Sequence, residues 1–184
     1  MGRRVIGVLC SGEGTNLQAL IDAGLPIVAV ASNRAGVTAL ARAEAAGIPT
    51  AVFDEADHGS REERDTALAR WLQAQGAELV VLAGYMHLLR PAFFEIFGRR
   101  IVNTHSAPLP GFPGRHPIED VLAAGVSETA ATIHWVDEGI DTGPVIRAER
   151  VAVEPGDTTD TLRARVQAVE HRLLPDVVRE LIAS

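Results

Sequence analysis

The amino-acid sequence predicts an α/β fold with an open, mostly parallel twisted sheet that carries helices on both faces. Three observations lead to this prediction. Apolar runs of strand length alternate along the chain with segments of helical periodicity. The run ELVVLAG at 78–84 is continuously apolar, as in a strand covered on both faces. No internal repeat or linker-like tract interrupts the alternation, so residues 1–184 are expected to form a single domain.

The first half of the chain alternates strand and helix patterns without a break. Strands are expected at 5–10, 26–32 and 50–53, and helices at 16–24, 38–47 and 60–76. Ser60 and Glu63 match a capping box, with Ser60 as the N-cap and Glu63 three residues later. The third helix is therefore expected to begin at this pair.

The second half continues the alternation and ends in a long helix. Strands are expected at 78–84, 100–105, 129–136 and 144–153, and helices at 91–98 and 117–125. The tail from Asp157 is expected to be helical, because Leu162, Val166 and Val169 fall on one stripe. Pro175 is expected to bend or interrupt this helix, since proline removes a backbone donor.

Composition and charge exclude several classes of protein. The 47% of hydrophobic residues can form a core, and the formal net charge of −7 argues against binding to nucleic acid or to an acidic membrane surface. All 17 basic residues are arginine and none is lysine. Schiff-base catalysis, attachment of pyridoxal phosphate and a P-loop lysine are thereby excluded.

The chain also lacks the marks of membrane, secreted and metal-binding proteins. No apolar run approaches the roughly 18–20 residues that cross a bilayer, and the N-terminus lacks the apolar region of a signal peptide. We therefore expect a cytoplasmic protein. The single cysteine, Cys10, lies in an apolar strand pattern and is expected to be inert. The six histidines show no ligand motif such as H-E-x-x-H, so no metal is expected.

A glycine-containing turn, SGEGTN, joins the first expected strand to the first helix. It does not match a dinucleotide fingerprint, because Leu17 stands where the third glycine belongs and no acidic residue ends the second strand. The backbone N–H groups of Gly14, Thr15 and Asn16 at a helix start suit one phosphate monoester. The plainer alternative is a tight turn in which Thr15 or Asn16 is the N-cap.

The strand at 100–105 ends on two polar side chains. Asn103 and His105 are two positions apart, so they face the same way at the carboxyl edge of the sheet, where open α/β sheets bind ligands. An amide donor beside an imidazole suits acyl transfer, because both can stabilise an oxyanion and the ring can move a proton. A simple capped strand end is the alternative.

A carboxylate near the imidazole would favour its protonated form. The loop VDEGIDTG offers Asp137, Glu138 and Asp141, and spacing alone does not choose among them. His134 alternates with Ile133 and Trp135 in a strand, which fits a core histidine and a pocket histidine equally well.

The ordered set SGEGTNLQAL, ASNRAG, ELVVLAGYMHLL, RIVNTHSAPLPGFPGRH, DEGIDTGPVI and ARVQAVEH resembles the phosphoribosylglycinamide formyltransferase family. The resemblance covers the chain from Val5 to about Pro175. It implies a formyltransferase-type Rossmann-like fold and a role in purine biosynthesis. It also implies direct transfer of the formyl group of 10-formyltetrahydrofolate to the amine of glycinamide ribonucleotide, through a tetrahedral intermediate.

The resemblance also implies roles for individual residues. Asn103, His105 and Asp141 match the catalytic amide, imidazole and carboxylate, and Glu170 matches the acid that receives the glycyl amine. The cradle for the substrate phosphate is matched by Gly14, Thr15 and Asn16. The folate-binding positions are matched by Arg61, Met86, His87, Leu88, Leu89 and Asn103.

Some of these positions have plainer interpretations or depart from the family pattern. Arg61 would be an ordinary solvated residue, Glu170 an exposed helix residue, and Met86 and Leu88 part of the core. Ser106 follows the catalytic histidine where relatives usually have proline. His87 stands where relatives often carry arginine, which is expected to weaken a folate contact, and the role of His116 is left open.

Three other functions compete with this interpretation. A formyl-folate hydrolase would use the same catalytic trio, a methionyl-tRNA formyltransferase would carry a further C-terminal domain, and a silent phosphate-binding module would bind without turnover. We expect small-molecule substrates, no nucleic acid and no membrane as partners. A monomer and a homodimer are both open.

Overall fold

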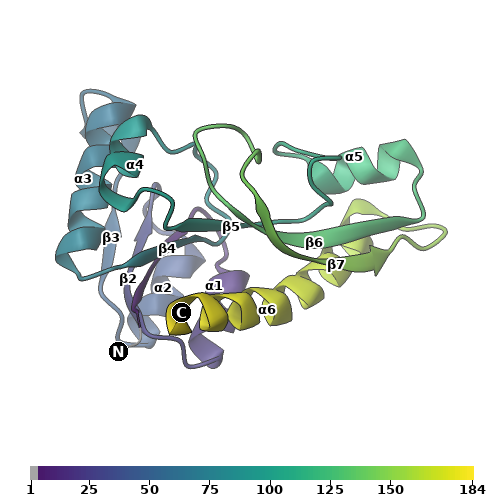
Figure 1. The fold of residues 1–184 in the computed structure, drawn as a ribbon, viewed down its shortest axis with the longest axis horizontal. Coiled ribbons are helices and arrows are strands. Elements are labelled where there is room, and N and C mark those ends of the chain that lie inside the picture. Colours follow the sequence, from purple (N-terminus) through teal and green to yellow (C-terminus); the bar gives the residue numbers. More distant parts are fainter. Residues whose placement is uncertain (1–3) are drawn as a thin grey trace.

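A seven-stranded sheet forms the centre of the molecule. The computed structural model describes residues 4–184, and its strands lie in the order β3-β2-β1-β4-β5-β6-β7 (Figure 1). The strands are β1 (Ile6–Cys10), β2 (Ile27–Ser32), β3 (Thr50–Val52), β4 (Leu79–Leu82), β5 (Ile101–His105), β6 (Glu128–Trp135) and β7 (Val145–Ala152). The pairs among β1 to β5 are parallel, whereas β6 pairs antiparallel with β5 and with β7. The predicted open, mostly parallel sheet is confirmed.

Helices cover both faces of the sheet, as the sequence predicts. They are α1 (Thr15–Asp22), α2 (Thr38–Ala45), α3 (Arg61–Ala74), α4 (Pro91–Phe97), α5 (Pro117–Ala124) and α6 (Thr159–Ala183), with a short 3-10 helix, η1 (Glu55–Asp57). One apolar core joins α3 and α4 to one face. The other core joins α1, α2, α5 and α6 to the opposite face.

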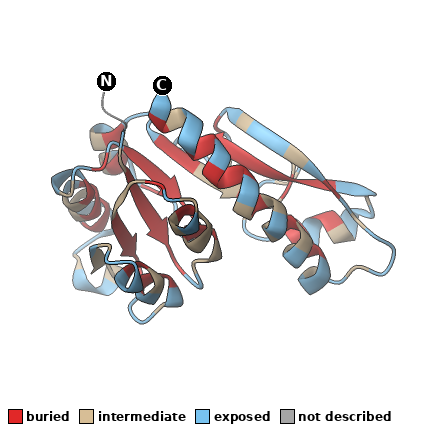
Figure 2. Ribbon diagram, turned by 90° about the horizontal axis from the view of Figure 1, so that it is seen from below, coloured by how far each residue is buried: buried red, intermediate tan, exposed pale blue. Residues whose placement is uncertain are grey.

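Strand side chains alternate between these two cores. Val8 belongs to the core of α1 and α6, and its neighbour Leu9 to the core of α3 and α4. Because helices lie on both sides, β1 and β4 are buried along their whole length, as their red colour in Figure 2 shows. Burial raises the pKa of the Cys10 thiol at the end of β1 to about 12, so the thiol stays protonated and unreactive, as predicted.

The last helix, α6, continues through Pro175 without interruption, so of the predicted bend or interruption the interruption is wrong. Pro175 is buried, and apolar residues around it pack into the core: Val166, Leu173, Leu174, Val177 and Val178. Each such side chain contributes about 1.5–3 kcal/mol. Together they outweigh the roughly 3 kcal/mol that a proline costs inside a helix. Near the end of α6, the carbonyl of Ile182 accepts a hydrogen bond from the N–H of Arg4 at 3.2 Å.

The predicted start of α3 is confirmed, but only half of the capping box forms. Ser60 Oγ accepts a hydrogen bond from the N–H of Glu63 at 3.1 Å. The Glu63 carboxylate accepts from the N–H of Gly59 at 3.0 Å, one residue before the N-cap that the motif predicts. A reciprocal box forms at the start of α6 instead, between Thr158 and Thr161.

We predict that Phe93→Ala lowers the free energy of unfolding by about 3–5 kcal/mol, because Phe93 is fully buried in the α3–α4 core and stacks on Phe97 at 5.2 Å. Urea denaturation followed by circular dichroism measures this loss. The control is Val52→Ala on the edge strand, where the side chain is 39% exposed and the loss should stay below about 1 kcal/mol. Equal losses in the two variants would contradict this account of the core.

Candidate active site

A cavity of about 670 Å³ opens at the edge of the sheet where β4 and β5 end. Segments that are far apart in the sequence line it: 84–89 after β4, 103–106 at the end of β5, the loops 114–119 and 136–141, and the N-terminal half of α6. Open α/β sheets bind ligands at this edge because the carboxyl ends of the parallel strands leave a crevice there. The cavity therefore stands where the sequence predicts the site.

The polar pair of β5 faces this cavity. Asn103 and His105 both line it, and His105 is only 6% exposed. The Nε2 atom of His105 lies 2.6 Å from the backbone carbonyl oxygen of Phe112, which can only accept, so Nε2 carries a proton. The opposite ring atom, Nδ1, lies 3.5 Å from the Asp141 Oδ2 atom. One ring nitrogen is thus fixed by the backbone and the other faces a carboxylate.

Asp141 is the acid that the fold brings to the imidazole. Its other oxygen, Oδ1, lies 3.5 Å from the Nε2 atom of His134, and Oδ2 accepts a hydrogen bond from the N–H of Gly114 at 2.9 Å. The backbone of Asp141 has φ +53°, a left-handed conformation that aspartate and asparagine tolerate better than most residues with a side chain. The loop stores this strain where the carboxylate enters the cavity.

The two other acids of the loop have different surroundings. Asp137 Oδ1 accepts hydrogen bonds from the N–H of Gly139 at 3.0 Å and from the Thr142 hydroxyl at 2.6 Å. Asp137 thereby stabilises the loop that presents Asp141, and Glu138 is exposed at the cavity rim. Gly143 lets the loop fold tightly, since a Cβ there would lie 1.8 Å from the carbonyl oxygen of Trp135. Of the three acids that spacing left open, the structure therefore brings Asp141 to the imidazole of His105.

The surroundings of Asp141 favour its charged form. Burial acts to raise the pKa of its carboxyl, but the His134 side chain, the Gly114 N–H and the nearby His105 ring act more strongly in the other direction. The net result is a pKa below the ordinary value of 3.8. The loop thus delivers a full negative charge to the two histidines at neutral pH.

His134 is a pocket residue, which settles the alternative that the sequence left open. It is 2% exposed and lies opposite Asn103 in the register of β5 and β6. Its Nδ1 atom faces the carbonyl oxygen of Trp135 at 2.8 Å, so Nδ1 carries the proton. Asn103 Nδ2 lies 3.2 Å from His134 Nε2, a contact that fixes the amide and leaves at least one of its two hydrogens for a ligand.

The glycine loop starts α1 in a way that the sequence did not predict. Gly14 is the N-cap, with φ +73°, in place of Thr15 or Asn16. A Cβ on Gly14 would lie 2.7 Å from Ala39, so only glycine fits there. The first N–H groups of a helix have no partner within the helix and can bind an anion. Of Gly14, Thr15 and Asn16, only Asn16 lines the cavity.

Glu170 is buried and joins the glycine loop to the end of β5. It is 3% exposed, so it is not an ordinary exposed helix residue. One carboxylate oxygen accepts from Asn16 Nδ2 at 3.1 Å, and the other accepts from the Ser106 hydroxyl at 2.6 Å. Asn16 Oδ1 is buried without a hydrogen-bond partner among the described residues. Glu170 and Asn16 thus present acceptors to a ligand that carries hydrogen-bond donors.

The segment after β4 forms an apolar wall of the cavity. Met86 and Leu88 are 55% and 51% exposed and line the cavity, which favours pocket lining over a core role. Leu89 is buried at the same wall, and His87 and His116 also line the cavity. The predicted folate-binding segment therefore lies together with Asn103 at one site.

Arg61 is the one predicted folate residue that the structure does not bring to this cavity. It is an exposed residue at the first position of α3, and its Nε atom lies 2.9 Å from Glu55 Oε2. An exposed ion pair of this kind contributes about 0–1 kcal/mol. Its role in binding stays a prediction.

The family model of the formyl transferases, described as "Formyl transferase", matches residues 4–178. The chain belongs to the formyl transferase family. The resemblance noted in the sequence is thereby confirmed, and solved structures agree. This formyl transferase has a TM-score of 0.96 and 42% identity to glycinamide ribonucleotide transformylase 1 from Symbiobacterium toebii, covering 100% of this chain and 90% of that one. For phosphoribosylglycinamide formyltransferase from Streptococcus pneumoniae the TM-score is 0.93, with 40% identity over 97% and 98% of the two chains.

Curated relatives of the formyl transferase carry related names. It is 42% identical over 179 residues to phosphoribosylglycinamide formyltransferase from Mycobacterium tuberculosis, covering 95% of this chain and 83% of the relative. It is 44% identical over 185 residues to the trifunctional purine biosynthetic protein adenosine-3 of Gallus gallus, covering 97% of this chain. The match spans only 18% of that relative's length.

Within residues 4–184, histidine, cysteine, aspartate and glutamate form no group of three or more that could hold a metal ion. In the same part of the chain, no helix combines the length and the apolar character of a membrane span.

We predict that Asp141→Asn removes a pH-dependent part of the stability. The lowered pKa means that the unfolded chain binds the carboxyl proton more readily, so the contribution of Asp141 is present above pH 3.8 and is lost as pH falls through its folded pKa. The difference in unfolding free energy between wild type and Asp141→Asn should shrink as pH falls below about pH 4.

Urea denaturation at stepped pH measures this difference. Asp141→Gly is the matched control, since it relieves the positive φ and also removes the charge. It should lose the same pH-dependent part as Asp141→Asn while differing by a constant offset. A difference that grows as pH falls below about pH 4 would exclude a lowered pKa.

Proposed function

We propose that this chain transfers the formyl group of 10-formyltetrahydrofolate to the amine of glycinamide ribonucleotide, a step of purine biosynthesis. The observation that carries the proposal is the Asp141 carboxylate 3.5 Å from His105 Nδ1, beside Asn103, in a cavity of a formyl transferase fold. The names of the relatives that match nearly the whole chain support the same reaction. No metal has a role in this proposal.

The reaction begins when the amine nitrogen attacks the formyl carbon. A carbon–nitrogen bond forms and the carbonyl electron pair moves onto oxygen. Asn103 Nδ2 has a free hydrogen for this oxyanion, because it carries two and His134 can bind at most one of them. Such a donor is worth about 2.7–4 kcal/mol in comparable sites.

Protonated His105 is the second donor. Its Nε2–H is bound to the Phe112 carbonyl, so the Nδ1–H on the Asp141 side is the one available. At 3.5 Å, Nδ1 is farther from Asp141 than in an ordinary hydrogen bond, which leaves this N–H available to the oxyanion. The Asp141 charge keeps the ring cationic while the intermediate lasts.

The intermediate breaks down when the bond between the formyl carbon and N10 of the folate breaks. The carbonyl re-forms, the amine gives up one proton and N10 takes one, so charge and atoms balance. The His105–Asp141 pair stands beside this exchange and serves as its relay. Holding both substrates in one cavity supplies a further large part of the rate.

The ribonucleotide binds along the line from the glycine loop to β5 in this proposal. Its phosphate binds the N–H groups at the start of α1, at Gly14, Thr15 and Asn16. Glu170 contacts Asn16 at one end of this line and Ser106, next to His105, at the other. We expect this carboxylate to receive the glycyl amine, as the resemblance implies, and this contact stays a prediction.

The folate side of the site consists of the 86–89 segment and Asn103. Met86 and Leu88 offer apolar surface to a flat ring system, and Asn103 stands at the catalytic end of the same cavity. A cytoplasmic location and a monomeric or homodimeric state stay predictions.

We predict that His105→Ala and Asp141→Asn each lower kcat by roughly 100-fold or more, because the first removes the imidazolium that stabilises the oxyanion and the second removes the carboxylate that keeps this ring cationic. The assay follows 10-formyltetrahydrofolate by absorbance with and without glycinamide ribonucleotide, and product analysis separates formylated ribonucleotide from free formate. His58→Ala, outside the cavity, is the control and should keep full turnover. Near-normal turnover in either site variant would end the proposed roles, and free formate as the main product would mean a hydrolase.

We predict that Glu170→Gln raises KM for the ribonucleotide about 10- to 100-fold and leaves KM for the formyl-folate unchanged. The change keeps the shape but removes charge-assisted hydrogen bonds, which are worth about 1.5–3 kcal/mol. Glu119→Gln, another carboxylate at the cavity, is the control, since it pairs with Arg163 at the surface. An unchanged KM for the ribonucleotide would exclude Glu170 from its binding site.

A further inference from the structure

A fully buried charged pair lies on α3, behind the folate side of the cavity. Arg64 and Asp65 are each 0% exposed. The Nε and Nη2 atoms of Arg64 donate to Asp65 Oδ1 at 2.9 Å and 2.7 Å. Buried ion pairs add little net stability, because desolvation offsets the attraction. The role of this pair is therefore better explained by the other contacts of the Arg64 guanidinium than by its contribution to stability.

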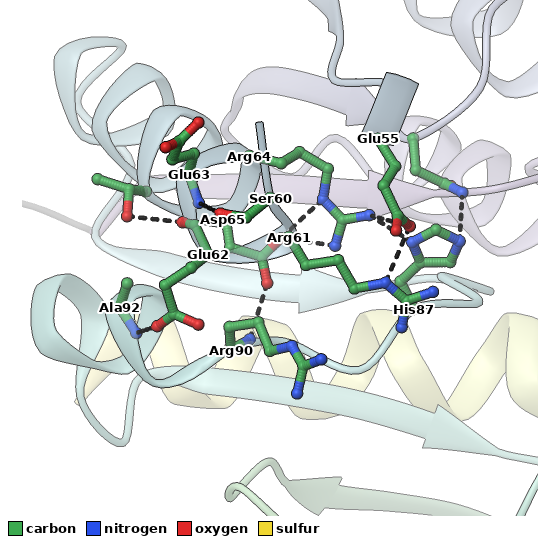
Figure 3. Close-up of polar contacts among 12 residues, drawn as sticks. Glu55, Ser60, Arg61, Glu62, Glu63, Arg64, Asp65, His87, Arg90 and Ala92 are labelled. Carbon is green, nitrogen blue, oxygen red and sulfur yellow. Dashed lines mark hydrogen bonds and ion pairs between the residues drawn. The ribbon is translucent and has the colours of Figure 1, made fainter. Parts of the chain in front are cut away.

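The third arm of the guanidinium reaches the segment that lines the cavity. Arg64 Nη1 is hydrogen-bonded to His87 Nδ1, and Figure 3 shows the guanidinium between Asp65 and the His87 ring. Arginine has no lone pair to offer, so it donates and His87 Nδ1 accepts. The ring is then neutral, with its hydrogen on Nε2.

The other ring nitrogen of His87 is also held by the protein. His87 Nε2 lies 3.1 Å from the Asn33 amide nitrogen, and a 180° rotation of that amide brings its oxygen to the Nε2–H. The same rotation turns the Asn33 NH2 group toward the Ser11 hydroxyl, which lies next to the other amide atom and accepts from it. Both nitrogens of His87 thus have partners in the protein, which leaves neither to bind a folate.

The same network fixes the backbone on both sides of His87. The Ser11 hydroxyl accepts from the N–H of Met86 at 2.8 Å. Asp65 Oδ2 accepts from the N–H of Arg90 at 2.7 Å, a bond that Figure 3 also shows. The cavity wall is therefore anchored before, at and after His87, while Met86 and Leu88 remain exposed toward the cavity.

We propose that Arg64 is a positioning residue for the formyl-folate site, which it shapes by fixing His87 and, through it, the wall formed by residues 86–89. His87 then acts through the wall and not as a direct ligand. The proposal rests on the proposed function, because it assigns this wall to the folate. It adds a residue of α3, which does not itself line the cavity, to the folate side of the site.

The charges around His87 support a neutral ring. Burial lowers its pKa, and the positive charges of Arg64 and Arg61 lower it further, while Glu55 and Asp65 oppose this in part. A second positive charge facing the Arg64 guanidinium would break the contact. Acidification below the ordinary histidine value of 6.5 should therefore loosen the wall once the ring is forced to take a proton.

The test is binding of a stable formyl-folate analogue, 10-formyl-5,8-dideazafolate, by isothermal titration calorimetry in the absence of ribonucleotide. Arg64→Met should raise Kd and KM for the folate by about 10-fold or more, since an anchor of the wall is lost. KM for glycinamide ribonucleotide should stay within about twofold. Arg70→Met, an exposed arginine of the same helix, is the matched control and should change neither value.

Two substitutions at His87, the hydrogen-bond partner of Arg64, also test the proposal. They decide it if Arg64→Met does not fold. Asparagine keeps an acceptor where Nδ1 stands, and glutamine keeps a group where Nε2 stands. His87→Asn should keep Kd within about threefold of wild type, and His87→Gln should lose about 10-fold. The weakening of wild-type binding below pH 6.5 should also be smaller in His87→Asn, because asparagine does not titrate and only the other histidines of the cavity remain.

Opposite results would overturn the proposal. Unchanged folate binding in Arg64→Met would mean that Arg64 does not shape the folate site. Rescue by glutamine and not by asparagine would mean that His87 acts through its Nε2 side and not through its contact with Arg64. Absence of binding by the wild-type protein would refute the proposed function itself. Normal wild-type binding with an unaffected Arg64→Met variant would refute only the role of Arg64.

Discussion

The arrangement of the cavity depends on one electrostatic contact, the approach of the Asp141 carboxylate to His105 and His134. The two rings come from neighbouring strands, β5 and β6, while the carboxylate comes from the loop between β6 and β7. A buried carboxylate is costly unless charges and donors compensate it, and here two imidazoles and the Gly114 N–H do so. The contact therefore ties together the hairpin, the end of β5 and the loop before α5.

The features that depend on local sequence patterns, such as the helices, the strands and the facing of side chains within a strand, were predictable from the sequence. Alternating strand and helix patterns gave the layers, because each strand must be covered on two faces. The period of two in β5 was enough to put Asn103 and His105 side by side. Glu170 and the 86–89 segment followed from the resemblance, and the structure brings them to the same cavity.

Features that depend on tertiary neighbours were not predictable. His134 reaches the site through antiparallel pairing with β5, which no pattern within β6 reveals. Asp141 differs from Asp137 and Glu138 only in the path of the loop, where its positive φ turns the carboxylate inward. Arg64 stands in the charge-rich run REERD, which reads as a solvated first turn, and only its contacts with 86–90 show that it is buried. Pro175 stays within α6 because its neighbours are buried on both sides.

The hydrogen bond between Arg4 and Ile182 brings the two ends of the described chain together at the far end of α6. Ile182 lies 12 residues beyond Glu170, which corresponds to about 18 Å along a helix axis. A domain whose polypeptide enters and leaves at one point can be joined to other modules, or circularly permuted, without strain on its interior. This architecture explains in physical terms how a unit of this kind can occupy 18% of a longer trifunctional polypeptide.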